Sequence, residues 1–151
     1  MLGWLDIILR LGAAVLIGSM IGLDREMHHK STGMRTLGLV ALGSALAVLA
    51  MANDPKADAS RVIQGVITGV GFLGAGVILH GPTGVQVQGL ITAAAIWITA
   101  SLGVLCGLAA WRILAVGLVL TFFLLIAVGA VERRLNRRRD SDQQSDRTGT
   151  A

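Results

Sequence analysis

The sequence has too few charged residues to make the surface of a soluble protein. Only 15% of its 151 residues are charged, and 54% are hydrophobic, whereas a soluble domain carries roughly 25% charged residues. The mean hydropathy is +0.71. Folding in water buries about 70% of the unfolded surface at this length, and the rest must be polar enough to face water. The composition therefore excludes an ordinary soluble domain and predicts a membrane protein.

Several chemical signatures are also missing. The one cysteine, Cys106, cannot form an intramolecular disulfide. The sequence contains no P-loop, no HExxH and no recognisable set of nucleophile, base and orienting residue, so we expect no enzymatic activity. The first residues lack the basic segment and the cleavage site of a signal peptide, and we expect the first helix to stay in the mature protein.

Five apolar stretches meet or approach the length that crosses a bilayer. A span needs roughly 20 apolar residues, because lipid cannot satisfy backbone polar groups and the hydrocarbon core is about 30 Å thick. We predict an all-α fold, a polytopic transmembrane bundle with about five spans, at residues 5–23, 36–52, 62–79, 89–105 and 109–131. Ser60 is expected to cap the third helix. Residues 1–134 would form the membrane domain and residues 135–151 a disordered, basic cytoplasmic tail.

The basic residues predict the orientation, since lysine and arginine accumulate in cytoplasmic loops. With five spans, Arg25, Lys30 and Arg35 lie on the same side as the arginine-rich C-terminal end. That side is predicted to be cytoplasmic, with the N-terminus outside. The net charge of +4 then reflects membrane topology, and we expect the lipid bilayer rather than a nucleic acid as the partner.

Glycines are concentrated in two of the predicted spans. They are Gly18 and Gly22 at GxxxG spacing in the first span, and Gly65, Gly69, Gly71, Gly74 and Gly76 in the third. Gly65, Gly69 and Gly76 share one helix face, and small residues let transmembrane helices approach closely. We expect a helix-packing role for these glycines, with the third span as the central element. The alternative that the sequence leaves open is a thin, deformable helix beside a binding cavity.

A cluster of ionisable residues ends the first span. It comprises Asp24, Arg25 and Glu26, and Arg35 and Thr36 follow at the start of the second span. Charges there are costly to bury unless paired, so the residues either form a polar site at the cytoplasmic end or remain solvated at the interface. Asp24 and Glu26 are also candidate ligands of a hydrated Mg²⁺, whereas the neighbouring histidines at 28 and 29 would suit a transition metal better. The metal remains unknown, and no other cofactor is expected.

Polar residues also occur within the spans. Asp6 and Arg10 form an i,i+4 pair that should neutralise itself. Thr92 and Thr99 lie seven residues apart on one helix face and are expected to hydrogen-bond to a neighbouring helix. Trp97 lies near the middle of a span, where its indole N–H needs an internal partner.

Five motifs in series resemble the membrane domain of the MgtC/SapB family. In order they are GLDRE at 22–26, GMRTL at 33–37, RV at 61–62, GVGFLGAG at 69–76 and GLITAAAIW at 89–97. The resemblance covers roughly residues 5–131 and adds Arg61, Gly89, Thr92 and Trp97 to the residues of interest. Two departures are notable. Well-studied members continue into a folded cytoplasmic domain, which we expect this chain to lack, and Ile91 stands where the family commonly has threonine.

The resemblance implies a multi-pass protein of the bacterial cytoplasmic (inner) membrane. The family is associated with adaptation to low magnesium and, in pathogens, with survival inside host cells. We therefore expect a non-enzymatic regulator linked to magnesium homeostasis, which contacts other membrane proteins and forms a homo-oligomer. The alternative is an oligomeric transporter or channel subunit for a cation or small solute.

Overall fold

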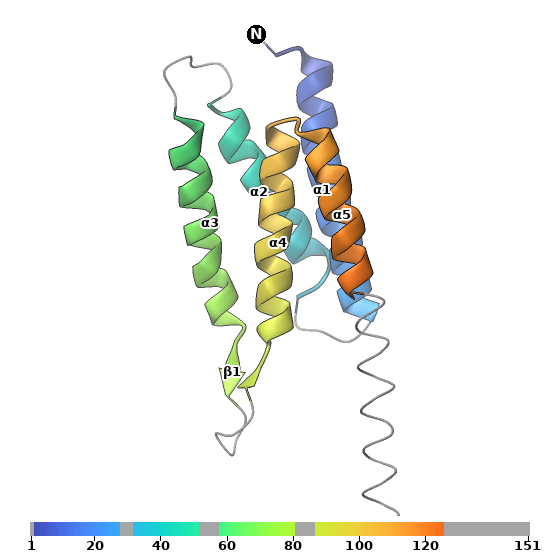
Figure 1. The fold of residues 1–151 in the computed structure, drawn as a ribbon, viewed down its shortest axis with the longest axis vertical. Helices are drawn as coiled ribbons and strands as arrows, with labels where there is room; N and C mark the ends of the chain where they lie inside the picture. The colour runs from blue at the N-terminus through green and yellow to red at the C-terminus, as the bar shows by residue number, and fades with distance from the viewer. Residues whose placement is uncertain (1, 28–31, 52–57, 81–86, 126–151) are drawn as a thin grey trace, which may run out of the picture. The chain divides into compact units, whose positions relative to one another are not determined.

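The computed structural model describes residues 2–27, 32–51, 58–80 and 87–125, and these residues form five helices and one short antiparallel ladder (Figure 1). The helices are α1 (Trp4–Met27), α2 (Met34–Leu49), α3 (Ala59–Gly76), α4 (Leu90–Gly107) and α5 (Trp111–Phe123). β1 (Leu79–His80) pairs with β2 (Val87–Gln88). The helical fold class is confirmed. The ladder was not predicted, because two residues per strand leave no alternation to recognise.

Two of the described helices, α1 and α4, are both long and apolar enough to cross a membrane. α2 and α5 are apolar but shorter; the 16 residues of α2 extend for about 24 Å. α3 is as long as α4 but carries Arg61 and Gln64. The prediction of about five spans is thus supported for two helices. The predicted tail at 135–151 lies outside the described residues.

α1 exposes apolar side chains that a soluble protein would bury. Only 28% of its most apolar stretch is buried, and Leu9 and Leu16 are 58% and 65% exposed. A continuous apolar face of this kind needs lipid or another protein as its surroundings. Together with its length, this exposure indicates that α1 belongs to a membrane protein.

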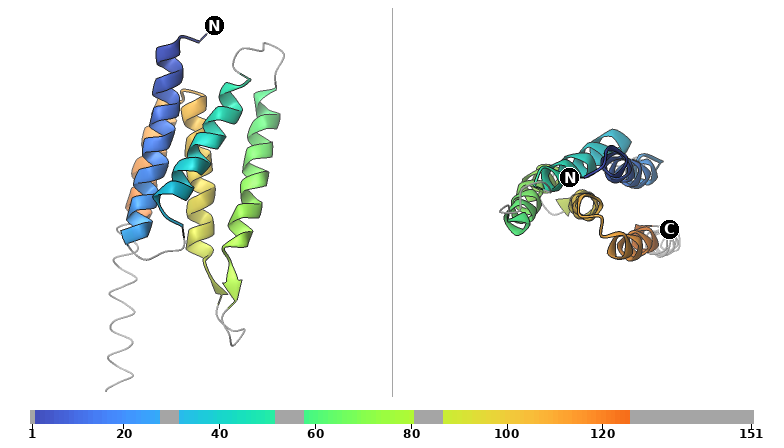
Figure 2. Two further views of the ribbon diagram at one scale, coloured as in Figure 1. Left: turned by 180° about the vertical axis from the view of Figure 1, so that it is seen from behind. Right: turned by 90° about the horizontal axis from the view of Figure 1, so that it is seen from above.

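α2 and α4 form the centre of the helix packing. α2 contacts both α1 and α4, and α4 also contacts α1 and α3 (Figure 2). Leu37, Ala41 and Ala45 of α2 are fully buried, as is Ala100 of α4. The chain divides into two units after Ala115, and all of these contacts lie within the first unit.

The prediction that the third span is the central helix is wrong. Among the residues of α3, only Val70 and Gly74 are buried, whereas more than half of α4 is buried. Glycine has no side chain to bury, so a helix rich in glycine gains little by moving to the centre. α4 instead combines small residues with Ile96 and Leu102, which are almost completely buried.

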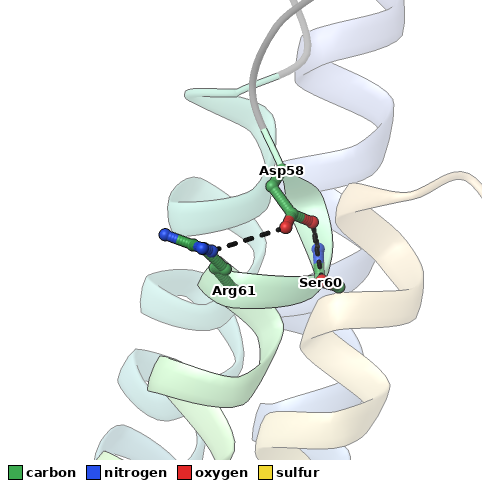
Figure 3. A network of polar contacts seen from close by, with 3 residues as sticks. All are labelled: Asp58, Ser60 and Arg61. Atoms are coloured by element: carbon green, nitrogen blue, oxygen red, sulfur yellow. Dashed lines mark hydrogen bonds and ion pairs between the residues drawn. The ribbon is translucent and has the colours of Figure 1, made fainter.

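The start of α3 differs from the predicted cap. Asp58, not Ser60, is the N-cap residue. Its Oδ1 accepts hydrogen bonds from the Ser60 backbone N–H at 3.0 Å and from the Ser60 hydroxyl at 2.6 Å (Figure 3). The Arg61 Nε atom lies 3.6 Å from Oδ2. The hydrogen bond from the Ser60 hydroxyl, followed by the backbone bond, lowers the pKa of the Asp58 carboxyl below its ordinary value.

Candidate polar site at the ends of the α1–α4 pair

Arg25 is the buried member of the charged cluster at the end of α1. Its residue exposure is 3%, and its Nη2 atom donates a hydrogen bond of 2.6 Å to the Thr92 Oγ1 atom. Thr92 lies in the first turn of α4 and is also buried. The predicted first span ended at Leu23, but α1 continues through the cluster to Met27, because the guanidinium finds a partner inside the bundle.

Gly89 determines where Thr92 lies. It precedes α4 with a φ of +92°, a left-handed conformation that glycine adopts without steric cost. A Cβ atom at this position would overlap the Val77 carbonyl oxygen. The glycine therefore lets the chain turn tightly from β2 into α4, and Thr92 follows three residues later.

Arg10 makes a corresponding connection at the other end of the two helices. Its Nη1 atom donates to the Gly107 carbonyl oxygen at 2.9 Å, and its Nη2 atom lies 2.7 Å from Asp6 Oδ2. The predicted pairing of Asp6 with Arg10 is confirmed. The bond to Gly107 was not predicted, since it joins residues 97 positions apart.

The two arginines fix the register of α1 against α4. Arg10 and Arg25 are fifteen residues apart on α1, and their partners Gly107 and Thr92 are fifteen residues apart on α4. The helices are therefore antiparallel, with polar connections about 22 Å apart along the axis. This spacing places each guanidinium near an end of the apolar stretch, where long basic side chains are least costly in a membrane.

Between these connections, α1 and α4 each approach α2 too closely to leave space. A Cβ atom on Gly18 would lie 2.5 Å from the Leu37 carbonyl oxygen, and one on Gly22 would overlap Met34 Cα. Gly103 of α4, which the sequence analysis did not identify, would overlap Ala41 of α2 in the same way. α1 and α4 are thus each packed against α2 with backbone against backbone.

The glycines of α3 have different surroundings. A Cβ atom on Gly65, Gly69, Gly71 or Gly76 would meet no described atom within 4 Å, and one on Gly74 would make ordinary contact with Ala93 at 3.5 Å. Gly65 and Gly69 border an open groove of about 560 Å³ between α2 and α3. The sequence alternative of a thin helix beside a cavity describes this arrangement better than close packing within the chain. The groove is lined by Arg35, Thr36, Leu39, Val40, Gly43, Ser44, Gly65, Val66, Gly69, Val70 and Leu73.

The residues of the predicted cytoplasmic-end site have separate surroundings. Arg25 is buried, Asp24 is half-buried and Glu26 is exposed, because successive side chains point about 100° apart around a helix. Glu26 accepts a hydrogen bond of 3.3 Å from the Met34 backbone N–H at the start of α2. The remaining two members, Arg35 and Thr36, line the groove.

The proposed metal ligands remain untested. Within the part of the chain that the structure describes, no three His, Cys, Asp or Glu side chains gather into a possible metal site. The histidines at 28 and 29 lie outside the described residues. Asp24 and Glu26 therefore stay candidate ligands from sequence alone.

The expectation that Thr92 and Thr99 hydrogen-bond to a neighbouring helix is confirmed for Thr92, which accepts from Arg25 of α1, and is wrong for Thr99. Thr99 is fully buried, but its hydroxyl donates to the Ala95 carbonyl of its own helix at 2.7 Å and not to a neighbouring helix. Trp97 is 46% exposed, so its side chain lies on the open side of α4. Ile91 is 56% exposed and lies outside the buried contact between Arg25 and Thr92. A threonine hydroxyl at position 91 would therefore not hydrogen-bond to Arg25.

One protein-family model matches most of this chain. A model of the MgtC family matches residues 11–134, which include Arg25, Thr92 and both walls of the groove. The chain belongs to the MgtC family. It is thus a membrane-associated protein of this family, in agreement with the apolar helices α1 and α4.

Several MgtC-family relatives are similar over most of this chain. Protein SrpB of Synechococcus elongatus is 43% identical, over 86% of this chain and 77% of its own length. Protein MgtC of Salmonella typhimurium is 36% identical over 86% of this chain, and Protein MgtC of Brucella abortus is 40% identical over 83%. The chain spans 55% and 50% of these two MgtC proteins. No solved structure matches this chain significantly.

Proposed function

We propose that this chain is a multi-pass, non-enzymatic protein of the bacterial inner membrane that regulates other membrane proteins in magnesium homeostasis. The similarity to the MgtC proteins supports the link to magnesium. The apolar helices support the membrane location. The regulatory role rests on the packing described above, and the basic residues support an orientation with the N-terminus outside and the C-terminus in the cytoplasm.

The observation that carries the regulatory role is the absence of room where α1 and α4 each approach α2. Gly18, Gly22 and Gly103 each lie so close to α2 that even a methyl group would overlap it. A solute passing between these helices would have to separate backbones that are in contact. Arg25, the buried charge that a transport pathway would use, is instead bonded to Thr92.

The surface available to partners lies mainly on α3. It is the least buried helix of the first unit, and Phe72 is 82% exposed. In lipid, exposed small and aromatic positions offer a partner helix dispersion contacts without the cost of removing water. The glycine pair of α1, for which the sequence analysis predicted a helix-packing role, is already covered by α2.

The function is tested by the growth of a deletion strain in graded magnesium. The intact gene should restore growth at low magnesium. Thr92→Val removes the acceptor of the Arg25 bond and should lower the unfolding free energy by about 1 kcal/mol, with partial loss of rescue. Ile91→Val changes the exposed neighbour and is the matched control.

Purified protein in proteoliposomes distinguishes regulation from transport. Regulation predicts no magnesium flux while a partner membrane protein is still retained by the tagged chain. Flux that disappears in Asp24→Asn or Glu26→Gln would contradict regulation and support an oligomeric transporter. Rescue that is independent of magnesium concentration would contradict the link to magnesium.

A further inference from the structure

The groove between α2 and α3 combines an apolar length with a charged end. Its lining extends along α2 from Arg35 to Ser44, which corresponds to about 14 Å. α2 and α3 are antiparallel neighbours, so Leu73 of α3 lies towards the Arg35 end and Gly65 towards the Ser44 end (Figure 2). Glycines on both walls, Gly43 and Gly65 among them, leave the groove without side chains at these points.

Among the described residues that line this groove, polar side chains available for binding occur at the Arg35 end. The Ser44 hydroxyl donates to the Val40 carbonyl of its own helix at 2.8 Å, so it is already satisfied. Arg35 is exposed, and among the described residues no carboxylate pairs with it. Its guanidinium presents a fork of N–H donors that matches the oxygens of a phosphate.

We propose that this groove binds one anionic glycerophospholipid, with an acyl chain between the glycine-containing walls and the headgroup phosphate on Arg35. The inference rests on the membrane location proposed above. Charge at one end and apolar surface along the remainder match an amphiphile. A free phosphate would leave the apolar part of the groove empty. A second copy of the chain would place another Arg35 or an apolar helix beside Arg35, and neither complements its charge.

The test uses the full chain reconstituted in vesicles of equal parts phosphatidylglycerol and phosphatidylcholine, followed by native mass spectrometry. We expect the wild-type protein to retain one lipid, with phosphatidylglycerol favoured about fivefold, the scale of one arginine at an anionic surface. Gly69→Leu should fill the groove and remove the retained lipid. Gly43→Leu, on the opposite wall, should have the same effect.

Two further variants separate the apolar and charged parts of the site. Gly71→Leu is the matched control for the groove, because Gly71 is on the same helix, has equally open space at its Cβ position and does not line the groove; it should retain the lipid. Arg35→Gln should keep a bound lipid but lose the preference for phosphatidylglycerol, and Arg35→Lys should largely restore the preference.

The outcomes that overturn the proposal are distinct from failure of the membrane location. A protein that does not float with the vesicles contradicts the membrane location itself. A protein that floats but retains no lipid, or whose lipid survives both Gly69→Leu and Gly43→Leu, contradicts only the groove. Dimers that dissociate in Gly69→Leu would identify the groove as an interface between two copies. An unchanged headgroup preference in Arg35→Gln would remove Arg35 from the site.

Discussion

At Gly18, the α1 backbone lies against α2 so closely that an added Cβ would meet the Leu37 carbonyl oxygen at 2.5 Å and the Ala41 Cβ at 2.9 Å. At Gly71 of α3, the same added atom would meet nothing within 4 Å. Both glycines lie inside a helix, so they differ only in whether a neighbouring helix packs against them. Their alanine variants should therefore change stability in opposite directions.

We predict that Gly18→Ala lowers the unfolding free energy by about 1–3 kcal/mol, because α1 and α2 must separate to accept the methyl group. Gly71→Ala should raise it by up to about 1 kcal/mol, because alanine favours the helix and no clash opposes it. Reversible unfolding in mixed micelles, followed by circular dichroism, measures both. A stabilising Gly18→Ala would contradict the close packing of α1 on α2.

The polar residues show how far residue types alone can predict a site. The i,i+4 spacing of Asp6 and Arg10 predicts their pairing, because a helix fixes that distance locally. The partners of Arg25 and Arg10 on α4 are 67 and 97 residues away, and no local spacing reports them. The cost of burying a charge predicted only that a buried member of the cluster would need a partner; the packing of α1 on α4 identified Thr92 and Gly107 as the partners.

At the scale of the element, the N-terminus of α3 is held by one exposed carboxylate. Asp58 accepts two hydrogen bonds from Ser60, and these bonds lower its pKa in the folded protein. A lowered folded-state pKa means that the unfolded chain binds the proton more tightly. The stabilisation by the cap is therefore present above the ordinary aspartate pKa and is lost as the pH falls through the folded-state value.

We predict that the wild-type protein loses stability more steeply than Asp58→Asn between about pH 5 and pH 3, the range around the ordinary aspartate pKa. Thermal unfolding in detergent at several pH values measures the difference. Ser60→Ala should weaken the pH dependence by removing the hydroxyl donor. Ser101→Ala, which affects a serine bonded within α4, should leave it unchanged. Identical slopes for the wild type and Asp58→Asn would exclude a contribution from this cap.

The sequence predicted where the helices lie along the chain, but it did not predict which of them is central in the packing. Apolar stretches and the breaks between them located the first four helices, and the start of the fifth, to within four residues; the predicted end of the fifth span, at residue 131, lies outside the described residues. The glycine pattern suggested that α3 is central. Two helices approach closely, however, only when the neighbouring helix presents side chains that fit against the glycines. α2 offers Leu37, Ala41 and Ala45 to α1 and α4, and α3 is left with an open groove.

At the scale of the whole molecule, the topology is the prediction with the widest consequences. In a Cys106→Ser background, we expect Met27→Cys to react with a membrane-impermeant thiol reagent only after the cells are opened. Arg61→Cys should react in intact cells. Both side chains are exposed, at 71% for Met27 and 87% for Arg61, and they lie near opposite ends of the described helices. The reverse pattern would invert the orientation and place Arg35 and its groove end outside.

The sequence by itself determined that the chain is helical, apolar and a member of a membrane family, because hydropathy, helix length and motif order are properties of contiguous residues. Only the tertiary structure decided that Arg25 binds Thr92, that α4 rather than α3 is central, and that Gly65 and Gly69 border a groove. These features depend on which side chains from distant segments fill the same space. How closely two helices pack depends on the volumes of the side chains that meet between them. A pattern of small residues along one helix does not specify the side chains of its neighbour.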